Sequence, residues 1–181
     1  MSTEAAYGSW RSPITPDLLV EKVVGLSYPM PQGEAAVWVE MRPSEGGRYA
    51  IVRRDPGGGI ADVLPAGFAA RTLVHEYGGL SSTVHGDTMF FSNFTDQRLY
   101  RVVPGGEPQP ITPEPPQPAA HRYADPVVSP DGRWLVCVRE RHTEEAVINE
   151  IAVLPTDGSA EPRVLAAGHD FYSSPRMSPA G

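Results

Sequence analysis

The sequence has very little cysteine, very little lysine and no long apolar run. Cysteine and lysine each occur once among 181 residues, whereas arginine occurs 14 times. A single cysteine excludes an internal disulfide, and the apolar run around Cys137 predicts a small buried side chain instead of a reactive thiol. No stretch approaches the roughly 18 apolar residues of a membrane span, and residues 1–10 lack the basic and apolar regions of a signal peptide. We therefore expect a cytoplasmic location and no membrane partner.

The chain also lacks an excess of positive charge. Its formal net charge is −7, and binding to a phosphate backbone needs clustered lysine and arginine, so we expect no nucleic-acid partner. No cofactor is expected either. The abundant residues are glycine and proline, which number 18 and 20 and lie between short apolar runs. Their combined share is well above the average of about 12%, and this excludes a helical bundle.

Local patterns predict one short helix followed by many strands. Thr15 as N-cap, Pro16 at the first helical position and Gly25 as terminator predict the helix. Apolar runs separated by turn residues then predict antiparallel strands, over residues 35–41, 49–54, 80–85, 88–92, 99–103, 134–139 and 150–154. Proline fills seven of the fifteen residues 104–118, which predicts an extended surface connection; a ligand for a proline-binding module is the alternative.

Two side-chain patterns carry further expectations. The mixed-charge run from Arg139 to Glu145 predicts an exposed hairpin loop. The aromatic residues on the predicted strands are expected to pack between sheet faces, and they are Trp38, Phe90, Phe91, Tyr100 and Trp134.

An internal repeat indicates the architecture. Residues 125–132 and 174–181 share Pro, Ser, Pro and Gly at an offset of 49 residues, and a weaker relative of the same turn ends at Gly86. Periods of about 40 to 50 residues with several short strands per repeat are typical of β-propeller blades. We expect an all-β partial β-propeller of about three four-stranded antiparallel blades plus the start of a fourth, with a short N-terminal helix. A β-sandwich with a chance repeat is the alternative.

Four segments resemble the N-terminal propeller of the prolyl oligopeptidase family, in particular bacterial dipeptidyl or acylaminoacyl peptidases. They are residues 6–15, 71–79 (Arg-Thr-Leu-Val-His-Glu-Tyr-Gly-Gly), 128–133 and 169–176. The resemblance implies a propeller that restricts access of large substrates to an α/β-hydrolase domain with a Ser-Asp-His triad. The family therefore implies a serine-type peptidase, with peptides as partners once a hydrolase domain is joined.

The chain departs from this family at the catalytic machinery. It contains no Gly-x-Ser-x-Gly nucleophile elbow, so we expect no catalytic residue in it and no activity of the chain alone. Propellers close with about 4 to 8 blades, and three would leave an open arc, which is the pattern of a truncated gene product or partial sequence. The expected division is an arm over 1–26 and blade segments over 27–75, 76–120, 121–168 and 169–181.

Candidate binding residues are few. Glu76 and Tyr77 are weak substrate-binding candidates, because the resemblance implies that propeller carboxylates hold a peptide's free amino terminus. The alternative is a structural inter-blade segment in which Tyr77 is packed and Gly78 and Gly79 permit close approach. No metal site is expected at His75 and Glu76, because successive strand residues point to opposite faces.

A catalytic triad is not expected near the end of the chain. His169, Asp170, Ser173 and Ser174 have the right residue types, but neighbours in an extended chain cannot converge as a triad does. Two further functions stay open: a binding module that completes a propeller through homo-oligomers or exposed blade edges, and a TolB-like scaffold.

Overall fold

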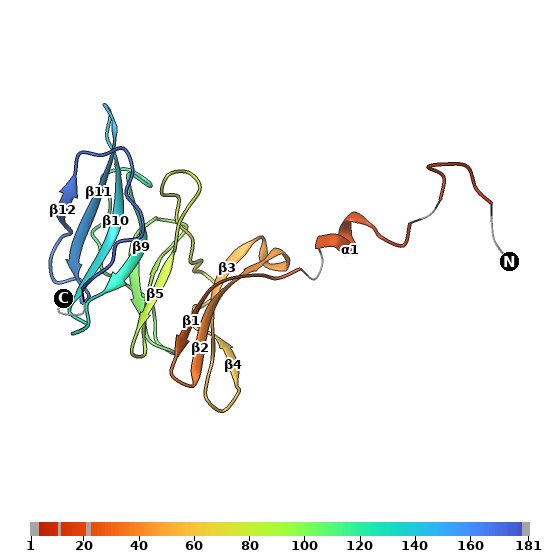
Figure 1. The fold of residues 1–181 in the computed structure, drawn as a ribbon, viewed down its shortest axis with the longest axis horizontal. Helices are drawn as coiled ribbons and strands as arrows, with labels where there is room; N and C mark the ends of the chain where they lie inside the picture. Colours follow the sequence, from red (N-terminus) through yellow and green to blue (C-terminus); the bar gives the residue numbers. More distant parts are fainter. Residues whose placement is uncertain (1–3, 11, 21–22, 179–181) are drawn as a thin grey trace.

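The computed structural model describes residues 4–10, 12–20 and 23–178 and contains three four-stranded antiparallel sheets in chain order (Figure 1). Each sheet is one blade with its strands in sequential order, so every neighbour pair is joined by a short connection. Blade one comprises β1 (Gly25–Gln32), β2 (Ala35–Arg42), β3 (Arg48–Arg54) and β4 (Ile60–Asp62). Blade two comprises β5 (Ser82–His85), β6 (Thr88–Ser92), β7 (Leu99–Val102) and β8 (Gln109–Pro110). Blade three comprises β9 (His121–Val128), β10 (Trp134–His142), β11 (Val147–Pro155) and β12 (Arg163–Ala167).

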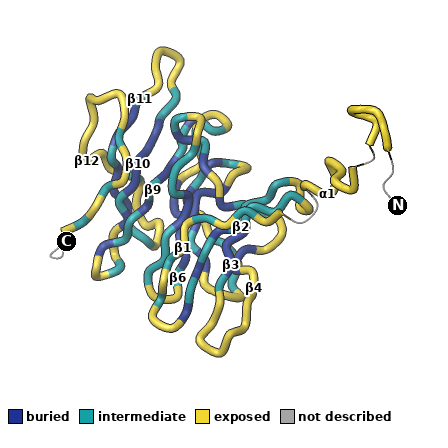
Figure 2. The backbone as a smooth tube through the Cα atoms, turned by 45° about the vertical axis from the view of Figure 1, so that its right-hand side comes forward, coloured by how far each residue is buried: buried dark blue, intermediate teal, exposed yellow. Residues whose placement is uncertain are grey.

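The N-terminal arm stands away from the blades. Its helix, α1 (Pro16–Val20), is shorter than predicted, and the predicted helical residues 21 and 22 lie outside the described part of the chain. Thr15 caps it as expected, since its hydroxyl accepts a hydrogen bond from the Leu18 amide at 3.2 Å. The residues whose burial is described in 4–19 are all exposed (Figure 2).

The core lies between successive blades, and the strand pleat explains how one strand serves two interfaces. Side chains alternate across a strand. On β6, Phe91 therefore packs toward blade one with Val39 and Ile51, whereas Phe90 packs toward blade three with Leu135. Figure 2 shows the resulting buried interior between exposed loops. The predicted all-β arc of three blades with one short α-helix is confirmed.

The first strand of the outer two blades carries a bulge at an x-Pro pair. Tyr28 and Asp125 precede prolines and have φ of 53° and 52°, and pairing shifts at both places. Ser174 also precedes a proline and has φ of 49°. The 49-residue repeat thus corresponds to a repeated backbone geometry at Asp125 and Ser174.

Asp125 uses this geometry to join neighbouring segments. Its Oδ1 accepts from the Leu80 amide at 2.9 Å, and its Oδ2 accepts from the Ser174 amide at 2.7 Å. Tyr28 makes a comparable link, because its hydroxyl donates to the Gly79 carbonyl at 3.1 Å. Residues before the prolines therefore tie the start of one blade to the next.

Several sequence expectations were wrong. The strands β1, β4, β8, β9 and β12 were not predicted, and β10 continues to His142 instead of ending at Arg139. The short strand β8 pairs with β7 inside the proline-rich segment that was expected to be an extended connection. The run expected as an exposed loop is therefore strand, with Glu140 buried at 2% exposure, and only residues 143–146 form the turn. Trp134 is 42% exposed instead of packed.

Other expectations agree with the structure. Cys137 is fully buried, and burial raises the pKa of its thiol to about 12. In the predicted Ser-Pro-Asp-Gly turn, Gly132 has φ of 74° and the Ser129 hydroxyl donates to Asp131 at 2.6 Å. Residues 179–181 of the second such turn lie outside the described residues. Within the described ranges, no helix has the length and apolar character that crossing a bilayer requires.

Candidate functional site

The turn over residues 74–77, in the connection from β4 to β5, has a strained backbone. His75 and Glu76 are consecutive non-glycine residues in the left-handed region, with φ of 54° and 62°, and Gly78 follows with φ of 82°. Such residues cost of order 1–2 kcal/mol each and persist only where surrounding contacts hold them. Besides backbone hydrogen bonds within the turn, the contacts that hold His75 and Glu76 come from blade three and from the segment that follows it.

His75 is fixed at three places. Its amide donates to Glu140 Oε2 at 2.7 Å, and its ring nitrogen Nε2 lies 2.9 Å from Asn149 Oδ1. The ring also meets Phe171 edge-to-face, with centroids 5.0 Å apart. Asn149 in turn donates to the Asp170 carbonyl at 2.6 Å. One histidine thus connects β10, β11 and the segment after β12.

A second set of contacts centres on Arg122 of β9. Its Nη1 donates to Glu76 Oε1 at 2.6 Å and to the Leu73 carbonyl at 2.9 Å, and it lies 3.3 Å from Glu140 Oε1. The hydrogen bond from Arg122 holds the pKa of the Glu76 carboxyl below its usual range. Glu76 is therefore a carboxylate at neutral pH, with its second oxygen unpaired among the described residues.

Carboxylate and imidazole atoms gather here in a way that resembles a metal-ligand set. Glu76, Glu140 and His142 place one ligand atom each within 4.8 Å of one another. The guanidinium of Arg122 lies between the two carboxylates, however, and provides the cation that they need. This arrangement is an ion-pair cluster with a resident arginine, and the donor set does not fit a metal.

The tip of the turn is open to solvent. Tyr77 is 98% exposed and Glu76 has a side chain 70% exposed. The expected packing of Tyr77 is wrong, whereas the close approach at the glycines is present: a Cβ on Gly78 would lie 3.0 Å from the Thr72 carbonyl, and one on Gly79 3.1 Å from Ala124 Cβ. The turn therefore combines a backbone that is held in place with two exposed, chemically distinct side chains.

Sequence reasoning identified Glu76 and Tyr77 but missed the residues that hold them. Arg122, Glu140 and Asn149 are 46 to 74 residues away from their partners in the turn. One signal was present in the sequence: Val138, Glu140 and His142 occupy every second position, as residues on one face of a strand do. This spacing is typical of a strand that continues past its apolar part.

The residues with triad chemistry near the C-terminus do not converge. Asp170 uses its backbone carbonyl, Ser174 its amide, and His169 contacts the Tyr172 ring at 5.8 Å between centroids. No Ser-His-Asp geometry is formed by these residues.

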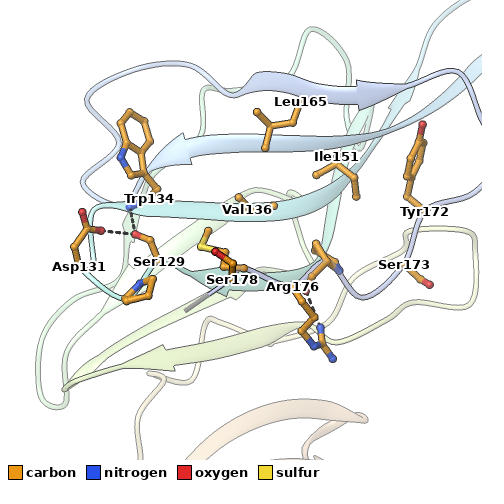
Figure 3. A pocket seen from close by; sticks show the side chains of 13 residues that line it. Ser129, Asp131, Trp134, Val136, Ile151, Leu165, Tyr172, Ser173, Arg176 and Ser178 are labelled. Atoms are coloured by element: carbon orange, nitrogen blue, oxygen red, sulfur yellow. Dashed lines mark hydrogen bonds between the residues drawn. The ribbon is translucent and has the colours of Figure 1, made fainter. Parts of the chain in front are cut away.

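The outer face of blade three carries an apolar groove of about 720 Å³ (Figure 3). Trp134, Val136, Ile151 and Leu165 form its floor, and the extended segment from Tyr172 forms its edge. The opposite face of this blade packs on blade two. The groove is thus a blade face that the described residues leave uncovered.

Fold and site together define a class of protein: a β-propeller region whose loops present charged and aromatic side chains. No protein-family model and no curated protein matches the chain. Solved structures do. A puromycin-hydrolysing peptidase from Mycobacterium tuberculosis matches 99% of this chain with 39% identity and a TM-score of 0.90. A puromycin hydrolase matches 99% with 35% identity and a TM-score of 0.88, and a serine-to-alanine mutant of puromycin hydrolase complexed with PGG matches 98% with 35% identity and a TM-score of 0.86.

The chain is similar, over almost its whole length, to a blade-forming part of the puromycin-hydrolysing peptidases, which are peptidases of the prolyl oligopeptidase family. It spans 30% of the length of each of these three relatives.

Proposed function

We propose that the chain is the propeller region of a serine peptidase and that it positions peptide substrates, and limits their access, for a hydrolase domain. The observation that carries the proposal is the turn over residues 74–77. Contacts with blade three hold the backbone of this turn, while the Glu76 carboxylate and the Tyr77 ring face solvent. A rigid backbone that carries exposed recognition groups is the arrangement that a substrate-binding loop needs.

The chemistry of the two side chains suggests the part of the substrate that they bind. The unpaired oxygen of Glu76 accepts a charge-assisted hydrogen bond from a primary ammonium group, such as a peptide's amino terminus. The exposed Tyr77 ring provides an apolar surface for an adjacent aromatic or aliphatic side chain. A substrate with a free amino terminus and a large first residue fits both groups.

A pair of probes tests this assignment on the full 181-residue chain. Puromycin carries a free α-amino group next to an aromatic side chain, and N-acetylpuromycin lacks the charge. We expect puromycin to shift the amide resonances of residues 75–79 in a titration followed by NMR, and N-acetylpuromycin to bind at least tenfold more weakly, as loss of a charge-assisted hydrogen bond predicts.

The matched variants are Glu76→Gln and Glu34→Gln. Glu34 is exposed in the β1–β2 turn and lies outside the site, so its variant should bind puromycin like the parent chain, whereas Glu76→Gln should lose the preference over N-acetylpuromycin. Equal binding of both probes by the parent chain would refute the assignment. The chain alone should not hydrolyse aminoacyl-nitroanilides, because the machinery for serine attack on a carbonyl is absent from its sequence.

The uncovered groove on blade three favours a second candidate function. Trp134 and Leu165 are 42% and 54% exposed there, and the corresponding face of blade two is covered by a neighbouring blade. A second copy of the chain that covered this face would make the protein a self-associating binding module. Sedimentation velocity distinguishes the two: a discrete dimer that dissociates in Leu165→Glu supports the module, and a monomer excludes it.

A further inference from the structure

The connection from β4 to β5 carries a second exposed charged group, Arg71. Its guanidinium carbon lies 5.4 Å from the centroid of the Tyr49 ring and 4.9 Å from that of Phe94. Two aromatic rings therefore hold the guanidinium through cation–π contacts, which do not use its N–H groups. Among the described residues, Arg71 has no side-chain hydrogen bond or carboxylate partner.

The surroundings of Arg71 form a small pocket of about 280 Å³ where blades one and two meet. Its walls are the β2–β3 turn with Glu45, the first residue of β3, Arg48, and the segment around Phe68. Glu45 is already paired with Arg48 at 2.5 Å and with Arg42 at 3.1 Å. The lining charges leave an excess of one positive charge, which resides on Arg71.

The pocket opens at the end of the blades where Glu76 lies. In a four-stranded antiparallel meander, the chain leaves the second and fourth strands at the same end. The β2–β3 turn, the β6–β7 turn with Phe94 and the β4–β5 connection with Arg71 and Glu76 all belong to this end. The same connection thus presents a cation and, five residues later, an anion.

We propose that Arg71, held by Tyr49 and Phe94, is a carboxylate-binding site. A planar guanidinium with a free edge binds a carboxylate through two parallel hydrogen bonds, and a stacked one loses little side-chain entropy on binding. The carboxylate comes from a peptide's C-terminus or from an acidic side chain, both of which offer the same two oxygens. This site does not depend on the amine-binding role of Glu76.

The test uses acetylated probes, which have no ammonium group for Glu76. N-acetylglycine is titrated into the isotopically labelled full chain, and the Arg71 Nε–Hε resonance is followed by NMR, with N-acetylglycinamide as the uncharged match. We expect saturable shifts at Arg71 and at residues 67–70 with the acid, and none with the amide. N-acetylglutamate α-amide, which carries only a side-chain carboxylate, identifies the source by comparison of the two dissociation constants.

Three variants complete the test. Arg71→Gln should lose binding of N-acetylglycine, and Arg71→Lys, which keeps the charge but not the planar fork, should bind at least fivefold more weakly. Arg54→Gln is the matched control, because Arg54 is also exposed but lies outside the pocket, and it should bind like the parent chain. Equal shifts with acid and amide, or unchanged binding by Arg71→Lys, would overturn the proposal. Should the glutamine variant fail to fold, the binding of N-acetylglycine by the lysine variant is the deciding measurement.

Discussion

Replacement of Asp125 by alanine should weaken the link between the start of blade two, blade three and the segment that follows it. The carboxylate accepts backbone hydrogen bonds from Leu80 at 2.9 Å and from Ser174 at 2.7 Å. Hydrogen bonds to a charged group contribute about 1.5–3 kcal/mol each. Because Asp125 is only partly buried, the lower end applies, and the two bonds together contribute about 3 kcal/mol.

The backbone adds a smaller cost. Asp125 has φ of 52°, and aspartate tolerates this conformation better than alanine does. We therefore expect Asp125→Ala to lower the free energy of unfolding by about 3–4 kcal/mol, out of a total of about 5–15 kcal/mol for a typical domain. Asp125→Asn keeps one acceptor oxygen and the tolerance for positive φ, and it should cost about half as much.

Urea denaturation measures the loss, and amide hydrogen exchange locates it. Protection of the Leu80 and Ser174 amides should fall in Asp125→Ala, while protection in the centre of β6 should follow global stability only. Asp87→Ala is the control, since Asp87 forms an ion pair with Arg53 at 2.9 Å but is 76% exposed, and exposed pairs contribute about 0–1 kcal/mol. A loss below 1 kcal/mol in Asp125→Ala, or unchanged exchange at Ser174, would refute the reasoning.

Three further outcomes are expected. Gly78→Ala should lower the free energy of unfolding by about 1–3 kcal/mol, because φ is 82° and a Cβ would lie 3.0 Å from the Thr72 carbonyl. The control Gly33→Ala, where φ is 60° and no atom lies near the added Cβ, should cost only about 1 kcal/mol in the same urea titration. Cys137 should react with a thiol reagent only at the rate of unfolding, because its thiol is fully buried with a pKa of about 12. The hydrogen bond from the Ser129 hydroxyl lowers the pKa of Asp131 to about 2, below its unfolded value of about 3.9, so its stabilising effect is complete above about pH 4 and is lost as the pH falls through about 2; an NMR titration with a midpoint near 4 would contradict this.

The predicted strands were the ones with plain periodicity, and the missed strands fall into two groups with different physical reasons. β1, β8 and β9 contain prolines at Pro29, Pro110 and Pro126, and proline inside a run argues against a strand unless the strand lies at a sheet edge, as β8 does, or a bulge accommodates it. The structure has such bulges, with the preceding residue in the left-handed region. β4 (Ile60–Asp62) and β12 (Arg163–Ala167) are exposed along their whole length, so no alternation of apolar and polar residues marked them.

The candidate site, too, was predictable from the sequence only in part. The residue types at Glu76 and Tyr77 could be noted in the sequence, but their roles depend on distant partners. Arg122 pairs with Glu76 across 46 residues, and Phe94 stacks on Arg71 from another blade. Such juxtapositions result from blade packing, and no local pattern contains them.

The sequence by itself determined the class of fold, because turn chemistry and strand periodicity are local properties. The 49-residue repeat shows the same turn pattern twice. It also determined that Cys137 is buried, since an apolar run on a strand needs a core. Only the tertiary structure decided that Glu140 is a buried anchor and not a loop residue, that Tyr77 is exposed, and that Arg71 is held between two rings. These depend on which blade faces meet, and contacts between faces join residues that are far apart in the chain.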